Sequence, residues 1–152
     1  MAKERQISTS RVIAADRQAI FDVIADPAKH PLIDGSGTVQ QSRESGPERL
    51  EKGATFGMDM KIGAPYKITN TVVEFEEGER IAWRHFGGHR WRYEFKDVDG
   101  GTEVTETFDW SRAKSPLALE LARYPKRNLK GMKATLERLD QLMTTGSVDD
   151  AA

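Results

Sequence analysis

The hydrophobic and polar residues of this chain follow two different periods, and each period predicts one kind of secondary structure. Residues 5–15 alternate and are rich in β-branched side chains, which favours a strand, whereas residues 15–26 carry apolar side chains at helical spacing. Alternation returns over residues 37–112, and helical spacing returns over residues 115–143. The pattern predicts a strand, one or two short helices, about six further strands and one long helix.

The first predicted helix carries signals at both of its ends. Asp16 is placed to accept a hydrogen bond at the N-terminus, and Ile20 and Ile24 share one face. Pro27 ends this helix, because the residue before a proline is displaced from helical geometry. Residues 27–34 have room for one more short turn that starts at the proline.

The strands of the central region are separated by short turns that contain glycine. These turns lie at residues 63–65, 76–80, 87–89 and 99–101. Consecutive hairpin connections of this kind predict a curved antiparallel sheet.

The last segment predicts a long amphipathic helix. Its apolar residues recur at helical spacing: Leu129, Met132, Leu136, Leu139 and Met143. Pro125 is expected to kink or divide the helix.

Together these elements predict an α+β fold in which a curved antiparallel sheet of about seven strands wraps around the C-terminal helix. A straight helix cannot follow a curved sheet along its whole length, so a gap between them is a natural ligand cavity. We expect one domain over residues 1–145 and a disordered tail over residues 146–152.

The hairpin over residues 81–95 can form in two registers. A two-residue loop would turn Arg84 toward the core and Trp83 outward, whereas a three-residue loop does the reverse. Burying an unpaired charge is the more costly error, so we favour the longer loop, with a glycine in its left-handed position. His85 then faces the cavity near Trp91.

Composition narrows the classes of partner. The chain has 152 residues, 38% of them hydrophobic and 31% charged, and a formal net charge of −1. This balance offers no basic field for nucleic acid, and no cysteine is available for disulfides or thiolate chemistry. The first residues are polar, and no apolar run approaches the roughly 20 residues that span a bilayer. We expect a cytoplasmic monomer or homodimer without stable membrane insertion.

Two inward-facing residues could carry acid–base chemistry. Glu106 falls on the inward face between Val104 and Phe108, where burial would raise its pKa unless a cation or hydrogen-bond donors compensate. It is either a general acid or base or an internally satisfied carboxyl. Asn70 has the same parity as Ile68 and is equally open to ligand binding or internal pairing.

Metal and cofactor sites are not expected. His85 and His89 have the spacing H-x3-H, but they flank a turn, and a two-residue hairpin would point their rings to opposite faces. The sequence contains no P-loop, no dinucleotide-binding glycine motif and no nucleophile elbow.

The order of elements and several segments resemble the START-like helix-grip (SRPBCC) superfamily, within it the polyketide cyclase/dehydrase and lipid-transport group. The resemblance covers about residues 5–143 and is carried by residues 19–31, 53–84, 91–111 and 131–142. It implies a pocket for a hydrophobic small molecule, and in a few members cyclase or dehydratase activity, without a shared catalytic motif.

We therefore expect a lipid or polyketide-like molecule to bind between the sheet and the C-terminal helix. The predicted ligand-binding residues are Phe56, Met58, Met60, Tyr66, Ile68, Asn70, Trp83, His85, Trp91, Tyr93, Glu106, Phe108 and Met132. Residues 25–37 are predicted to form a gate, with Leu32 and Ile33 as its apolar underside and His30 at the solvated rim. The alternatives are a cofactor-free cyclase or dehydratase that uses Glu106 and His85, and a protein-interaction module with a filled core.

Overall fold

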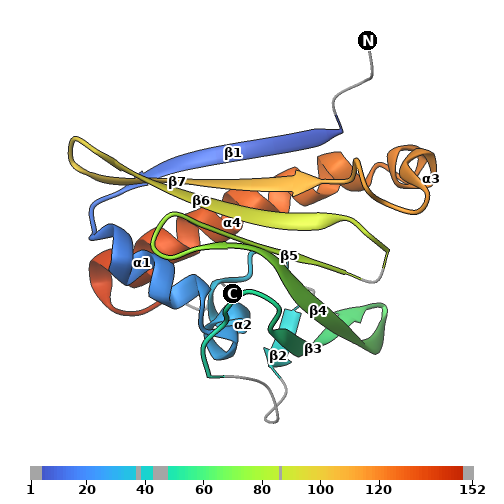
Figure 1. Cartoon of the computed structure of the whole chain (residues 1–152), viewed down its shortest axis with the longest axis horizontal. Helices are drawn as coiled ribbons and strands as arrows, with labels where there is room; N and C mark the ends of the chain where they lie inside the picture. Colours follow the sequence, from blue (N-terminus) through green and yellow to red (C-terminus); the bar gives the residue numbers. More distant parts are fainter. Residues whose placement is uncertain (1–4, 37–38, 43–47, 86, 149–152) are drawn as a thin grey trace.

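The computed structural model describes residues 5–36, 39–42, 48–85 and 87–148. Seven antiparallel strands form one sheet in the order β1-β7-β6-β5-β4-β3-β2, and a long C-terminal helix lies across one face of it (Figure 1). In chain order the elements are β1 (Gln6–Ile13), α1 (Arg17–Ile24), η1 (Pro27–Lys29), α2 (His30–Ile33), β2 (Val39–Ser42), β3 (Thr55–Ile62), β4 (Ala64–Glu76), β5 (Arg80–Arg84), β6 (Arg90–Val98), β7 (Gly101–Asp109), α3 (Pro116–Leu121) and α4 (Tyr124–Thr145). The predicted α+β fold is confirmed. Six of the strands have five residues or more, and the edge strand β2 has four.

The short helices after β1 begin where the sequence predicts. The Asp16 carboxylate accepts a hydrogen bond from the Ala19 backbone N–H at 3.2 Å, which caps α1. Asp26 caps the 3-10 turn η1 in the same way, and Pro27 occupies its first position. These caps direct the chain from α1 into the short helix α2.

The β5–β6 hairpin adopts the three-residue loop. Trp83 is paired with Trp91 and Ala82 with Arg92, so the loop comprises residues 86–88. Gly88 has φ +91°, the left-handed conformation that this loop requires. The predicted register is therefore confirmed, and both tryptophans lie on the inner face of the sheet.

The C-terminal segment is divided at the predicted place. Helix α3 ends at Leu121, Arg123 adopts a left-handed conformation with φ 61°, and α4 begins with Pro125 in its first turn. Helix α4 packs against β1 and β7, with Met132, Leu136 and Leu139 buried. Gly146 caps its C-terminus in the left-handed conformation. Residues 149–152 of the predicted tail lie outside the described residues.

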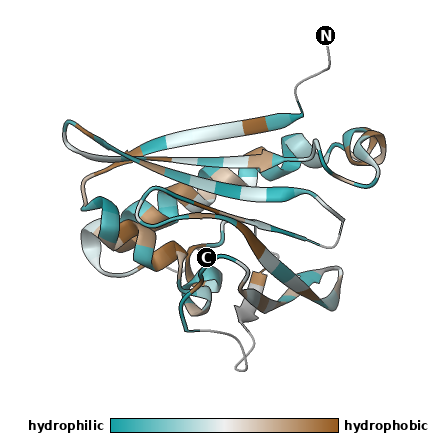
Figure 2. Ribbon diagram, in the orientation of Figure 1, coloured by the Kyte–Doolittle hydropathy of each residue, from teal (hydrophilic) through white to brown (hydrophobic). Residues whose placement is uncertain are grey.

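The core lies between the inner face of the sheet and the helices. Phe21 of α1 is fully buried and meets Phe75 and Phe95 edge to face, with ring centroids 5.6 Å and 5.4 Å apart. Hydrophobic and hydrophilic positions alternate along α1 and α4 (Figure 2), as amphipathic helices require.

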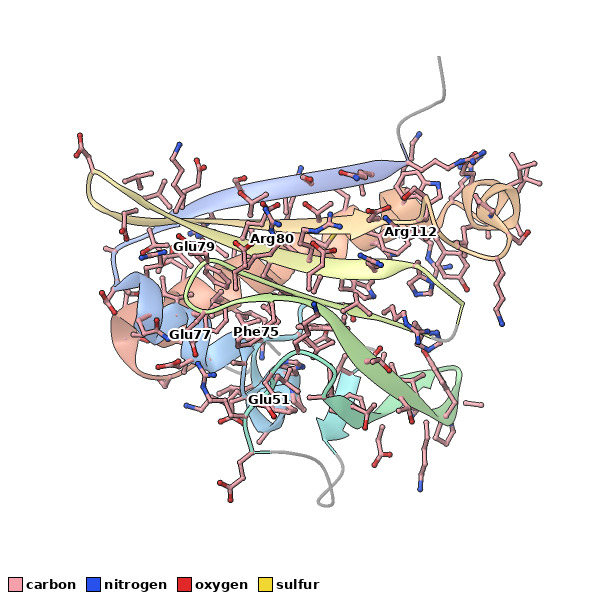
Figure 3. The ribbon with its side chains drawn as sticks, viewed as in Figure 1. Glu51, Phe75, Glu77, Glu79, Arg80 and Arg112 are labelled. Carbon is pink, nitrogen blue, oxygen red and sulfur yellow. The ribbon has the colours of Figure 1, made fainter. Side chains whose placement is uncertain are left out.

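The curvature of the sheet has a local cause in β4. The pairing of β4 with β5 shifts by one residue between Val72 and Glu74, and such a bulge bends a strand and increases its twist. The turn after β4 carries Glu77 and Glu79 beside α1 (Figure 3). Arg49 bridges Glu77 and Asp22 at 2.6 Å and 3.0 Å, which ties this turn to α1.

Candidate functional site

A cavity of about 160 Å³ lies between the inner face of the sheet, α4 and the segment that follows α1. Eleven of the thirteen predicted ligand-binding residues line it: Phe56, Met58, Met60, Ile68, Asn70, Trp83, His85, Trp91, Tyr93, Glu106 and Met132. The strands supply most of the apolar wall, because residues two apart along a strand face the same side. The alternation of side chains along the strands therefore predicted which of them line the cavity wall.

Two predicted residues lie elsewhere. Tyr66 is 39% exposed, near the end of the β3–β4 hairpin opposite Met60, and does not line the cavity. Phe108 is buried but is covered by Trp91 and Trp110, whose ring centroids lie 4.9 Å and 5.5 Å from its own. Side-chain parity predicts the face of a strand, but not where along that face the helix or a neighbouring ring fills the space.

The lining residues that are absent from the predicted ligand-binding and gate residues are mostly small or polar. These residues are Ile24, Asp34, Ser36, Val39, Asn128, Gly131 and Thr135. Asn128, Gly131 and Thr135 share one face of α4 with Met132, since they follow the spacing i, i+3, i+7. A search for apolar periodicity passes over such residues, although the helical spacing alone would have found them once Met132 was chosen.

Glu106 is the most deeply buried acid of the cavity. Its side chain is 4% exposed, and Tyr93 lies directly across the ladder on β6. Burial raises the pKa of Glu106 to about 8, hydrogen bonding from the Tyr93 hydroxyl lowers it in part, and the Asp34 carboxylate raises it further. Its Oε1 has no hydrogen-bond partner within the described part of the chain. Glu106 therefore presents an uncharged carboxyl to the cavity at neutral pH.

His30 lies in the wall and not at a solvated rim, contrary to the prediction. Only 9% of the residue is exposed, and its Nε2–H donates a hydrogen bond to the Ile24 carbonyl at 2.8 Å. Its ring stacks on Trp83 with centroids 5.0 Å apart and meets Phe56 edge to face. Burial lowers the pKa of His30, so the ring is neutral. The capped turn η1, which begins at Pro27, leads directly into α2 and orients the His30 side chain toward the cavity.

Residues 30–36, here called the flap, are attached to α4. The Arg138 guanidinium donates a hydrogen bond to the Leu32 carbonyl at 3.0 Å, and the Gly35 backbone N–H donates to the Thr135 hydroxyl at 2.9 Å. A Cβ atom at Gly35 would collide with the Ala134 Cβ, so only glycine fits this approach. The flap is therefore fastened directly over the helix that forms one wall of the cavity.

Of the two apolar residues of the flap, one lies where the prediction placed it and the other does not. Ile33 is 3% exposed and lines the cavity, as expected of the underside. Leu32 is 42% exposed and does not line it. Because this part of the flap is a helical turn, the adjacent residues Leu32 and Ile33 point in different directions and cannot both form its underside.

His85 and His89 stack on each other, with ring centroids 5.2 Å apart and an interplanar angle of 18°. The expectation of opposite faces is wrong, because it assumed the two-residue loop, and the three-residue loop places both rings on one side. Burial lowers the pKa of both, and that of His89 falls to about 4. Within the described ranges, no three His, Asp or Glu side chains are grouped so that they could hold a metal ion.

The site therefore combines an uncharged carboxyl with unprotonated imidazoles in one apolar cavity. Glu106 can donate a proton or a hydrogen bond, and His85, which also lines the cavity, can accept a proton. Most of the remaining wall consists of aromatic, Met and Ile side chains, which lower the polarity around these groups.

Comparison with protein families identifies the group to which this architecture belongs. Residues 4–144 match the family described as polyketide cyclase / dehydrase and lipid transport, so the chain belongs to that family. The uncharacterized protein Rv0088 of Mycobacterium tuberculosis H37Rv is 38% identical over 147 residues, covering 93% of this chain and 65% of the relative. The chain thus spans about two thirds of the length of that relative.

Solved structures share the fold at low sequence identity. Protein NE0264 of Nitrosomonas europaea aligns with a TM-score of 0.75 and 14% identity, covering 96% of this chain and 98% of that one. Major latex-like protein 151 of Panax ginseng aligns with a TM-score of 0.70 and 13% identity, covering 91% and 96%. These likenesses confirm the predicted helix-grip architecture.

None of the helices in the described ranges is both long and apolar enough to cross a membrane.

Proposed function

We propose that this protein binds a hydrophobic small molecule in the cavity between the sheet and α4. The observation that carries the proposal is the wall itself, in which aromatic and methionine side chains surround a space beside α4. Methionine adapts to irregular shapes, and Met58, Met60 and Met132 all line the cavity. The family is described as polyketide cyclase / dehydrase and lipid transport, and each of these roles requires a small molecule to bind.

The volume favours a compact ligand. At about 160 Å³ the cavity is close to the roughly 150 Å³ of an engineered apolar cavity that holds benzene. A one-ring compound therefore fits while the flap stays attached to α4. A long acyl chain would need the flap to move.

The binding proposal is tested by filling the cavity. Ile68 lines it from β4, so Ile68→Trp should reduce binding of benzene, followed by chemical-shift titration, at least tenfold. Thr69→Trp is the matched control, because Thr69 is exposed on the opposite face of the same strand and should leave binding unchanged. Native mass spectrometry of the purified protein should also show a co-purified guest. Equal benzene binding by both variants, with no guest in the wild type, would overturn the proposal.

A second candidate is a cofactor-free dehydratase or cyclase. The uncharged Glu106 carboxyl would donate a proton to a departing hydroxyl, which leaves as water, while the neutral His85 accepts the proton from carbon. Glu106→Gln should then abolish turnover while the fold, followed by circular dichroism, is retained. Full activity in a folded Gln variant would exclude Glu106 from the chemistry.

A further inference from the structure

The described lining of the cavity contains acidic side chains and no basic ones of the lysine or arginine type. Five titratable side chains line it, namely His30, Asp34, His85, Tyr93 and Glu106. Among the described residues of its lining, none is a lysine or an arginine. An anionic ligand would therefore be buried beside two carboxyl groups and without a counter-charge.

Several of these polar groups are already engaged within the protein. Asp34 accepts hydrogen bonds from the backbone and the hydroxyl of Ser36 and from the backbone N–H of Val39. The Nε2–H of His30 is bonded to the Ile24 carbonyl. These bonds fix the flap and the wall.

Glu106 carries a polar atom that is not engaged in this way. Its Oε1 is buried and has no hydrogen-bond partner in the described part of the chain, and the residue lines the cavity from β7. A buried polar atom without a partner costs about 1–3 kcal/mol, and a ligand that pairs with it recovers this cost. The orphaned atom therefore marks where a polar atom of the ligand belongs.

We infer that the ligand is an uncharged, compact ring compound that presents one hydrogen-bonding oxygen, such as a ketone oxygen, to the carboxyl of Glu106. This inference rests on the proposed binding function and narrows it. Fatty acids and other carboxylates are excluded from the cavity. The aromatic rings of Trp83, Trp91 and Tyr93 contact the ring of the ligand, and Glu106 sets its orientation.

Neither an anionic nor a cationic ligand suits this cavity. A carboxylate would lose its hydration next to Asp34 and Glu106, and burying an unpaired charge is expensive. A cation would gain only from Asp34, whose oxygens already accept hydrogen bonds, unless Glu106 first lost its proton. A neutral ligand avoids both the burial of an unpaired charge and the deprotonation of Glu106.

A series of one-ring compounds of nearly equal shape tests this charge selection. Acetophenone is neutral, benzoate is an anion and benzamidine is a cation, and benzene lacks the oxygen altogether. Binding is followed at pH 7 by chemical-shift titration of the ¹⁵N-labelled protein. We expect acetophenone to bind at least tenfold more tightly than benzoate and benzamidine. Equal or tighter binding of either ion would overturn the inference.

Two substitutions of Glu106 test the orientation. Gln keeps a hydrogen-bond donor at the same place, so Glu106→Gln should bind acetophenone within about threefold of the wild type. Glu106→Leu removes the polar group and should weaken acetophenone binding about tenfold while leaving benzene binding unchanged. Benzene thus reports whether the cavity survives the substitution. Unchanged acetophenone binding in a Leu variant that still binds benzene would contradict the role of Glu106.

The two proposals can fail separately. If benzene binds and Ile68→Trp blocks it, but acetophenone binds no more tightly than benzoate or benzamidine, the ligand class is wrong and the binding function stands. If benzene also fails to bind and no guest co-purifies, both proposals fall. The substitution Asp34→Asn tests the role of charge in a further way. Removing this negative charge should strengthen benzoate binding several-fold.

Discussion

Glu106 keeps its proton in the folded protein at pH values where the unfolded chain would release it, because burial raises its pKa from 4.5 to about 8. Between these values the folded state binds one proton more than the unfolded state. The contribution of Glu106 to the free energy of unfolding is therefore fully present below pH 4.5 and is lost as the pH rises toward 8.

Replacing Glu106 by Gln removes this dependence. The free energy of unfolding of Glu106→Gln, relative to the wild type, should increase by a few kcal/mol from pH 5 to pH 8. Urea denaturation at several pH values measures this difference, in which the other titrating groups cancel. Parallel pH profiles for the two proteins would show that Glu106 is not protonated in the folded state.

His30 is expected to act as a structural residue of the wall. His30→Ala removes the hydrogen bond to the Ile24 carbonyl and the stacking on Trp83, and should lower the free energy of unfolding by about 2–4 kcal/mol. The exposed neighbour Lys29 is the control, and Lys29→Ala should change it by less than about 0.5 kcal/mol. Equal effects in denaturant titrations would mean that His30 contributes nothing through burial.

At the scale of elements, the attachment of the flap to α4 depends on the absence of a side chain at Gly35. Gly35→Ala places a Cβ against Ala134 and the backbone of Thr135, so the flap must move away from the helix. Hydrogen exchange should become at least tenfold faster in residues 30–36, while β6 and β7 stay protected. Arg138→Ala, which removes a contact without adding a collision, should have a smaller effect. Unchanged exchange in Gly35→Ala would show that the flap tolerates the methyl group.

The flap also marks the limit of prediction from the sequence. Helix α1, the β5–β6 register and the division before α4 follow from caps, charge burial and Pro125, which act over a few residues. The contact of Gly35 with Thr135 joins residues 100 apart, and neither is apolar. No local pattern encodes such a pairing, so the partners of the gate could not be predicted.

For the whole molecule, the histidines and Glu106 act on stability in opposite directions. Burial lowers the pKa of His30, His85 and His89, so the unfolded chain binds more protons below pH 6.5 and stability falls as the pH drops. Above pH 6.5 the histidines no longer change the free energy of unfolding with pH. The decrease that Glu106 causes as the pH rises remains.

Three histidines outweigh one carboxyl on the acid side, so we expect stability to be greatest between about pH 6 and pH 7. Hydrogen bonding from Arg92 also lowers the pKa of Glu74, and its contribution is present above pH 4.5 and lost at lower pH. Thermal melts from pH 4 to pH 9 measure the profile. A melting temperature that rises steadily toward pH 4 would contradict it.

The architecture as a whole was predictable because consecutive hairpins leave few ways to arrange a sheet. Among the described strands, the pairing of β1 with β7 joins residues that are distant in sequence, and no turn in the sequence predicts it. The size of the cavity was not predictable. It depends on how Phe108 and Trp110 fill one end of the inner face beside Met132, which is a matter of side-chain packing.

The placement of the three tryptophans gives the molecule a built-in optical signal. Trp83 and Trp91 line the cavity, whereas Trp110 lies outside it and donates its indole N–H to Glu120 at 2.9 Å. A guest that enters the cavity displaces water from two of the three indoles and leaves the third unchanged. The emission of the unlabelled protein should therefore shift with occupancy, and libraries of compounds can be screened by intrinsic fluorescence alone.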